Sequence, residues 1–286
     1  MAQQLKSRVA CIQTCSGLRP EANIDEAERL IRRAVADGAT LVATPEMTNV
    51  IESKRDRLLG KVGQQQNDPS VKRLAKLAGE LKITLLVGSL ALRGGDDKLV
   101  NRSLLFAPDG SLVASYDKVH MFDVELEGGE RYHESRSYQA GARAVIADAR
   151  EGRIGMTICY DMRFAALYRV LAQAGAEIIT IPSAFTRPTG KAHWEVLLRA
   201  RAIETGCYVL APAQSGVHES GRKTYGHSMM VAPWGEIIGE MGEDTGILVA
   251  DIDLDEVKAA RRKVPALEHD RAFTGPGRGE FIRVAS

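Results

Sequence analysis

The sequence contains few cysteines, and they follow no pattern that would indicate disulfides or a metal site. Four cysteines in 286 residues are too few and too scattered for a disulfide framework. No Cys-x-x-Cys pair occurs, and Cys11 and Cys15 lack the second pair of ligands that a zinc site requires. We therefore predict that the protein binds no metal and works in a reducing compartment, the cytoplasm.

A charge imbalance and long apolar runs are also missing. The 38 basic and 37 acidic residues leave a net charge of +1, which argues against nucleic-acid binding and against an acidic tail. No apolar run reaches the roughly 18 residues of a membrane span, and the N-terminus lacks the apolar stretch of a signal peptide. With 44% apolar residues, the chain can still bury a sizeable core.

The chain instead shows a regular alternation of strand and helix patterns. Short apolar runs predict strands at residues 9–13, 41–44, 84–88, 102–106, 113–116, 144–147, 155–158, 178–181, 208–211, 228–231 and 247–252. Helical periodicity predicts helices at residues 21–36, 70–82, 164–173, 192–204 and 254–262. Asp109-Gly110 and Trp234-Gly235 mark hairpin turns among the βα units, so we predict a layered α/β domain. No linker divides the chain, and we predict a single domain over residues 1–273 with a loose tail over residues 274–286.

One pattern occurs twice. Residues 37–46 and residues 174–183 each contain a helix end, a glycine, a four-residue apolar strand and a proline. Any passage from helix to strand can look this way. If the repeat is structural, Glu46 and Ser183 lie at equivalent strand ends, where α/β folds build their sites.

Cys159 lies where a short apolar strand gives way to a helix. A thiol on such a turn stands at a sheet edge beside unpaired backbone N–H groups, which suits a nucleophile. A buried core cysteine is the other interpretation, since free cysteine is among the most buried residue types. Cys11 and Cys207 lie within apolar, strand-like runs, and for these two we predict the core.

Glu46 and Lys118 also follow predicted strands. A carboxylate at the position of Glu46 is desolvated unless it has a partner, and desolvation would raise its pKa towards the range that suits a general base. An ordinary loop carboxylate is the alternative. Lys118 stands before residues 119–142, where about 20 residues lack clear periodicity, and such long loops are usually functional or disordered. Its charge could point into a pocket, or it could be a solvated lysine at a strand end. Ring side chains in the loop argue against disorder: His120, Phe122, Tyr132 and Tyr138.

Three separated motifs together resemble the nitrilase superfamily of carbon–nitrogen hydrolases, from about residue 9 to about residue 270. They are Thr-Pro-Glu at residues 44–46, Tyr-Asp-Lys-Val-His at residues 116–120, and residues 155–164 around Cys159. Residues 182–185, 190–204 and 225–229 are similar to the Nit-type branch, which includes amidases of deaminated glutathione and ω-amidases. The resemblance implies a four-layer α-β-β-α sandwich, no cofactor, and a homodimer or larger homo-oligomer. Asp117 stands where the family usually has a basic residue, and we expect it to be exposed.

Amide hydrolysis through a covalent intermediate needs a nucleophile, a base and an oxyanion site. Cys159 can attack, and Glu46 can take the thiol proton and return it to the leaving nitrogen. Lys118 can hold the oxyanion together with the backbone N–H of Tyr160. The resemblance assigns the same roles and implies a second pocket carboxylate after the lysine, for which Glu134 is the best match. Its rivals are Glu125, Glu127 and Glu130.

Substrate contacts are predicted around the same segments. Arg163, four residues past the nucleophile, could pair with a substrate carboxylate or with a core carboxylate. His193 could line the pocket or be structural at the start of a helix. The remaining predicted substrate-binding residues are Tyr160, Phe185 and Thr186, with Phe122, Tyr132 and Tyr138 as apolar walls and Arg131 and Arg136 as further anion partners.

We therefore predict an amidase for a small carboxylate-bearing ω-amide, and the resemblance makes deaminated glutathione the leading substrate. The alternatives are an ω-amidase for 2-oxoglutaramate-type substrates, a broad aliphatic amidase, an N-carbamoyl hydrolase, a nitrilase, and a catalytically silent binding protein on the same fold. A Ser-His-Asp or Cys-His mechanism is disfavoured. No Gly-x-Ser-x-Gly motif occurs, and none of the six histidines forms a recognisable partner motif for Cys159.

Overall fold

The computed structural model describes residues 6–95, 98–125 and 131–275, and most of its strands belong to two six-stranded sheets. The first sheet has the order β16-β1-β2-β3-β4-β5, and the second has the order β15-β14-β11-β10-β9-β8. The first comprises β1 (Lys6–Gln13), β2 (Leu41–Ala43), β3 (Thr84–Arg93), β4 (Leu99–Phe106), β5 (Leu112–Asp117) and β16 (Gly246–Asp253). The second comprises β8 (Val145–Ala149), β9 (Gly152–Met156), β10 (Ile178–Thr180), β11 (Tyr208–Ala211), β14 (Met229–Val231) and β15 (Ile237–Glu240).

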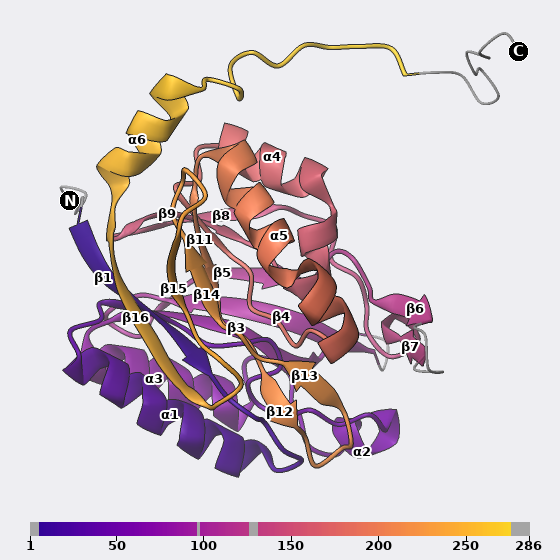
Figure 1. Ribbon diagram of the computed structural model, residues 1–286. Helices are drawn as coiled ribbons and strands as arrows, with labels where there is room; N and C mark the ends of the chain where they lie inside the picture. The colour runs from indigo at the N-terminus through magenta and orange to yellow at the C-terminus, as the bar shows by residue number, and fades with distance from the viewer. Residues whose placement is uncertain (1–5, 96–97, 126–130, 276–286) are drawn as a thin grey trace, which may run out of the picture.

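Helices cover the outer face of each sheet (Figure 1). The pair α1 (Pro20–Ala36) and α3 (Pro69–Leu81) lies on the first sheet, and the pair α4 (Ala165–Gln173) and α5 (Arg187–Thr205) lies on the second. The other helices are α2 (Arg55–Leu59), α6 (Leu254–Lys263) and two 3₁₀ turns, η1 (Glu134–Arg136) and η2 (Cys159–Arg163). Two small hairpins pair β6 (Asp123–Glu125) with β7 (Arg131–His133) and β12 (Ser215–Val217) with β13 (Lys223–Tyr225).

Alternating side chains of β1 explain the layers. Val9 and Cys11 belong to the apolar core that the strands of the second sheet share, whereas Ala10 and Ile12 pack with the helices α1 and α3. Successive residues of a strand point to opposite faces, so an unbroken apolar run such as residues 9–12 must be covered on both sides. The predicted four-layer α-β-β-α sandwich is therefore confirmed, and so is the core position of Cys11 and Cys207.

The two large sheets share one strand order. β1, β2 and β3 run parallel in the first sheet, as β9, β10 and β11 do in the second. In each sheet two antiparallel strands follow on one edge, β4 and β5 or β14 and β15, and one antiparallel strand, β16 or β8, closes the other edge. The similarity of residues 37–46 and 174–183 is thus structural, because β2 and β10 occupy equivalent places.

Several predictions about elements need correction. The helix predicted from residue 192 begins five residues earlier, at Arg187, because a proline in its first turn is compatible with a helix start. Residues 119–142 are not one irregular loop, since the described part contains β6, β7 and η1. The sequence also missed α2, β12, β13 and β15, which are all five residues or shorter and leave little periodicity to detect.

The tail predicted over residues 274–286 lies mostly outside the described residues, which end at 275, so the extent of the single domain stays a prediction. In the described part of the chain, no helix combines the length and the apolar character needed to cross a membrane.

Candidate active site

Four side chains from different elements meet at the carboxyl-terminal ends of strands. Glu46 follows β2, Lys118 follows β5, and Cys159 follows β9, while Glu134 lies in η1 on the connection from β5 to β8. Glu46, Lys118 and Cys159 are 3%, 2% and 7% exposed. All four line a cavity of about 360 Å³, so the structure brings together the four residues that the sequence analysis selected for catalysis.

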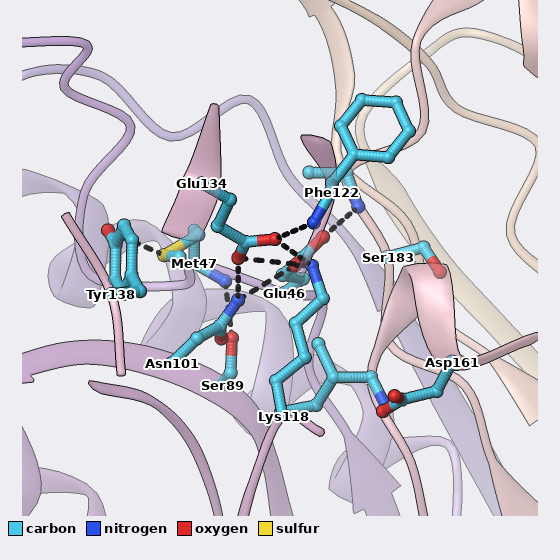
Figure 2. Close-up of polar contacts among 12 residues, drawn as sticks. Glu46, Met47, Ser89, Asn101, Lys118, Phe122, Glu134, Tyr138, Asp161 and Ser183 are labelled. Carbon is cyan, nitrogen blue, oxygen red and sulfur yellow. Dashed lines mark hydrogen bonds and ion pairs between the residues drawn. The ribbon is translucent and has the colours of Figure 1, made fainter. Parts of the chain in front are cut away.

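The ammonium group of Lys118 lies between two carboxylates (Figure 2). Its Nζ is 3.0 Å from Oε1 of Glu46, and 2.8 and 3.1 Å from Oε2 and Oε1 of Glu134. The amide Nδ2 of Asn101 donates to both carboxylates, at 2.9 Å to Glu46 and 3.2 Å to Glu134. Asn101 therefore holds the two acids in a fixed relation to the lysine.

Backbone amides anchor the other oxygens of the two carboxylates. The N–H of Ala184 donates to Oε2 of Glu46 at 2.8 Å, and the N–H of Phe122 donates to Oε2 of Glu134 at 2.7 Å. Ala184 follows β10 of the second sheet, so Glu46 is held by groups from both sheets. Charge-assisted bonds of this kind are about twice as strong as neutral ones, which restrains the carboxylates in one orientation.

A glycine lets the two sheets approach each other beside Glu46. A Cβ at Gly88 in β3 would lie 1.9 Å from the carbonyl oxygen of Thr44 and 2.4 Å from Cβ of Pro182. Atoms cannot approach so closely, so any side chain here would push apart the segments that carry Glu46 and Ala184.

The backbone of Cys159 lies in the left-handed region, with φ at +49°. Such a conformation is unfavourable for a non-glycine residue and persists only where its surroundings enforce it. The buried carboxylate of Asp161 does so, because it accepts from the N–H of Ile158 at 2.9 Å, the hydroxyl of Tyr116 at 2.7 Å and the N–H of His120 at 3.0 Å. Asp161 lies within the motif at residues 155–164, but the sequence pattern indicates no role for it; in the structure its carboxylate fixes the turn that presents the thiol.

Burial and neighbouring charges set the protonation states. Burial, together with the nearby carboxylate of Glu46, raises the pKa of the Cys159 thiol, and the charge of Lys118 only partly opposes this. Burial alone would also raise the pKa of Glu46, but the charges of Lys118 and Arg222 and the hydrogen bonds from Cys159 and Asn101 outweigh it and lower that pKa. The raised pKa expected for an unpartnered Glu46 is therefore not found, because the carboxylate is buried with partners. Burial by itself would lower the pKa of Lys118. The negative charges of Glu134 and Glu46 outweigh this effect and raise that pKa above its usual value, so the lysine stays protonated.

The predicted substrate-binding residues divide into two groups. Tyr160, Phe185 and Thr186 line the cavity, as do the predicted apolar walls Phe122, Tyr132 and Tyr138. Arg163 and His193, both within the described chain, are not among the residues that line it. The guanidinium of Arg163 instead lies 3.2 Å from Nδ1 of His193 and packs 5.6 Å from the ring centre of Phe185.

Other charged residues also differ from expectation. Arg136 does not line the cavity, whereas Arg131 lines it but pairs with Glu125 and is 67% exposed. Glu125 is therefore no rival to Glu134, and Glu127 and Glu130 lie outside the described residues. We expected Asp117 to be exposed, but its side chain is partly buried. Arg102 on the neighbouring strand donates to both of its carboxylate oxygens, at 2.6 and 2.7 Å.

Sequence reasoning missed three residues that contact the carboxylates or line the cavity, Asn101, Ala184 and Arg222. Asn101 carried only a weak signal, since it is one of three consecutive polar residues, Asn101 to Ser103, between the apolar ends of β4. Ala184 acts through its backbone and Arg222 lies in a turn between two short strands, so neither carries a pattern that could be found. Among the described residues, no group of three or more His, Cys, Asp or Glu side chains is placed to hold a metal ion.

Comparison with known proteins places the chain in a family. A sequence model for carbon-nitrogen hydrolase matches residues 8–262. The deaminated glutathione amidase of Yersinia enterocolitica is 41% identical over 269 residues, which cover 93% of each chain. Among solved structures, Saccharomyces cerevisiae Nit3, of branch 10 of the nitrilase superfamily, has a TM-score of 0.83 at 32% identity over 92% of this chain and 96% of that chain.

A further solved structure concerns the cysteine. A variant of an amidase from Nesterenkonia shows covalent addition of the acetamide moiety of fluoroacetamide at its active site cysteine. It has a TM-score of 0.76 at 26% identity, over 92% of this chain and 96% of that chain. As its three motifs predicted, this chain belongs to the carbon-nitrogen hydrolase family and is a hydrolase of the amidase class.

Proposed function

We propose that this protein hydrolyses a small carboxylate-bearing ω-amide through a thioester on Cys159, with deaminated glutathione as the leading substrate. The observation that carries the proposal is the ammonium of Lys118, held between the buried carboxylate of Glu46 and the partly buried carboxylate of Glu134 beside a thiol in one cavity. A thiol, a base and a fixed cation are the three groups that acyl transfer from an amide requires.

The first half of the reaction forms the thioester. Because the pKa of Cys159 is raised, the thiol is neutral before substrate arrives and needs a base at the moment of attack. Glu46 takes the proton as the sulfur bonds to the amide carbon, and it then donates that proton to the leaving nitrogen as the C–N bond breaks. The products of this half are the acyl-enzyme and free ammonia or an amine.

The second half releases the acid. A water molecule loses a proton to Glu46 and attacks the thioester carbon, the C–S bond breaks, and the proton returns to the Cys159 sulfur. In both halves a tetrahedral oxyanion forms, and the ammonium of Lys118 and the N–H of Tyr160 are the donors for it. Tyr160 lies in the first turn of η2, where N–H groups have no intrahelical acceptor. Glu134 orients the lysine.

The choice of substrate rests on relatives. The chain is 41% identical to a deaminated glutathione amidase over nearly its whole length, and the Nesterenkonia amidase supports a covalent role for the cysteine. A cavity of about 360 Å³ is within the usual size range for small-molecule sites.

The experiment compares substrates from each candidate class. Purified protein is incubated with deaminated glutathione, 2-oxoglutaramate, an uncharged aliphatic amide, an N-carbamoyl amino acid and a nitrile, and the acid product is quantified by mass spectrometry. We expect the highest kcat/KM for deaminated glutathione and an acyl adduct on Cys159 in rapidly quenched samples. Equal kcat/KM for the uncharged amide would indicate a broad aliphatic amidase, carbon dioxide release a carbamoyl hydrolase, and no turnover and no adduct a binding protein.

We also propose a homodimer or a larger homo-oligomer in the cytoplasm, with residues 1–273 as one domain. Val196 and Ile203, seven residues apart on α5, are 67% and 57% exposed, and Trp234 is 52% exposed. Residues at this spacing lie on the same face of a helix, so they form an apolar face that a second copy could cover. Light scattering after size-exclusion chromatography tests this, and a monomer at micromolar concentration would contradict it.

A further inference from the structure

Four cationic side chains line the cavity, and one of them differs from the others. Lys118 pairs with Glu46 and Glu134, Arg131 with Glu125, and Arg55 with Asp56. Arg222 lines the same cavity, yet no carboxylate among the described residues lies within ion-pair distance of it. A half-buried guanidinium without an anion partner is uncommon, because desolvating a charge without a counterion is unfavourable.

The hydrogen bonds of Arg222 leave donors unused. A guanidinium has five N–H donors. One Nη2 donor binds the carbonyl oxygen of Ala184 at 2.6 Å, and the plane of the group packs 5.5 Å from the ring centre of Tyr132. The buried Nε has no partner among the described residues. The side chain is thus held in place by Ala184 and Tyr132, while part of its hydrogen-bonding capacity stays available on the cavity wall.

Ala184 also connects Arg222 to the reacting groups. Its N–H donates to Glu46 and contacts the Cys159 thiol, and its carbonyl accepts from Arg222. One residue spans about 3.5 Å and each hydrogen bond about 3 Å, so the guanidinium and the thiol lie within roughly 10 Å. A five-carbon chain with one end at the thiol and the other at the guanidinium fits within this limit.

The charges of the site require such a group for an anionic substrate. Glu46, Glu134 and the ammonium of Lys118 leave one negative charge in excess. A substrate carboxylate would therefore be repelled unless another cation faced it. The charge of Arg222 reaches this cluster, because it is one of the causes that lower the pKa of Glu46.

We propose that Arg222 binds the carboxylate on the acyl half of the substrate and thereby selects ω-amides of dicarboxylic acids. The assignment rests on the proposed function and replaces Arg163, which lies outside the cavity. The backbone of Arg222 is held within the β12–β13 hairpin, because the carbonyl oxygen of Arg222 accepts from the N–H of His218 at 2.9 Å.

The test uses glutaramate and its methyl ester, which have the same length and differ in the charge of the carboxyl group. Arg222→Gln should lower kcat/KM for glutaramate on the order of 100-fold, mainly through KM, and change kcat/KM for the ester less than about 3-fold. Arg222→Lys, which keeps the charge but not the planar fork, should lose about 10-fold on glutaramate alone. Glutarate should inhibit the wild type competitively and inhibit both variants more weakly.

Arg187→Gln is the matched control, because Arg187 binds the same hairpin at the carbonyl of Thr224 but does not line the cavity. It should leave both substrates unchanged. Equal losses on glutaramate and ester in the Arg222 variants would overturn the proposal and indicate that Arg222 only supports Ala184. Selectivity lost instead in Arg163→Gln would also overturn it.

The two proposals fail in different ways. If the wild type does not distinguish glutaramate from its ester, the proposed substrate class is wrong. If the wild type distinguishes them and the Arg222 variants still do, the substrate class stands and the role of Arg222 is wrong. If Arg222→Gln does not fold, Arg222→Lys and the glutarate inhibition decide between these outcomes.

Discussion

The two halves of the molecule have one topology and place different chemistry at equivalent positions. In strand register, Cys11 pairs with Ala43 in the first sheet as Met156 pairs with Thr180 in the second. Three residues further along each strand, the first half has Thr14 and Glu46, and the second has Cys159 and Ser183. Thr14 therefore corresponds to Cys159, and Glu46 corresponds to Ser183. At these two positions each half has one reactive group and one hydroxyl.

The hydroxyls at these places are structural. The Thr14 hydroxyl donates to Oε1 of Gln214 at 3.2 Å, and the Ser183 hydroxyl donates to the carbonyl of Ile181 at 3.0 Å. The acid and the thiol, in contrast, face each other across the sheet interface, with Lys118 beside them. The repeated framework thus has four similar strand ends, those of β1, β2, β9 and β10. Only two of them carry the reactive side chains, the end of β2 with Glu46 and the end of β9 with Cys159.

The largest expected effect comes from removing the nucleophile. Cys159→Ala should reduce kcat by more than about 10⁴-fold, because no other group can form the thioester. Thr14→Ala at the equivalent place is the matched control, and it should lower stability by about 1 kcal/mol with kcat changed less than about 3-fold. Steady-state kinetics and thermal unfolding test both variants. Near-normal turnover by a folded Cys159→Ala protein would contradict the proposed mechanism. A large loss of kcat in Thr14→Ala would contradict the structural role given to the hydroxyl.

Removing the cation contributed by the first half should have the next largest effect. Lys118→Met should lower kcat by about 100- to 1000-fold, because the charge matters most when the oxyanion forms. It also leaves two carboxylates facing each other, so the melting temperature should fall. A rise in KM with unchanged kcat would mean that Lys118 only binds substrate.

A smaller effect concerns stability and pH at the hairpin of the second half. Burial lowers the pKa of His218 to about 4, so the folded protein keeps this ring neutral while the unfolded chain takes up a proton below about pH 6.5. Stability should therefore fall from about pH 6.5 towards pH 4, by about 2 kcal/mol between pH 7 and pH 5 from this group. Urea unfolding of the wild type and of His218→Gln at both pH values measures it. An equal pH dependence in the two proteins would contradict the assignment.

The smallest expected effect is on the positioning of the two acids. Asn101→Ala should lower kcat about 10-fold with little change in KM, because the carboxylates lose the amide that holds them. The bond from Asn101 contributes to the lowered pKa of Glu46, so its loss should raise that pKa and move the acid limb of the kcat/KM profile to higher pH. An unshifted acid limb would show that Asn101 has only a structural part.

The success of the sequence analysis followed local patterns. Strand ends before Glu46, Lys118 and Cys159 were visible because apolar runs and turn residues lie next to one another in the chain. The repeat of residues 37–46 was visible for the same reason. Glu134 needed the family resemblance, since four acidic residues compete within a short segment.

The failures followed contacts between distant segments. The direction of the Glu46 pKa shift depended on whether the carboxylate has partners, and the sequence could not decide this. Burial was visible from the neighbouring residues, but the partners Lys118, Asn101 and Arg222 were not. Arg163 was chosen for its closeness to Cys159 in the chain, but its guanidinium packs on Phe185 and does not line the cavity.

The sequence by itself determined most of the longer elements, the layered α/β class and the residue types proposed for the chemistry. Those properties depend on short-range periodicity and on residue type. Only the tertiary structure decided which of the equivalent strand ends face one another, which charges neutralise one another, and which arginine reaches the cavity. The physical reason is that electrostatic and hydrogen-bond energies depend on distances between atoms, and the folding of the two sheets onto each other sets those distances between residues more than 100 positions apart, such as Glu46 and Ala184.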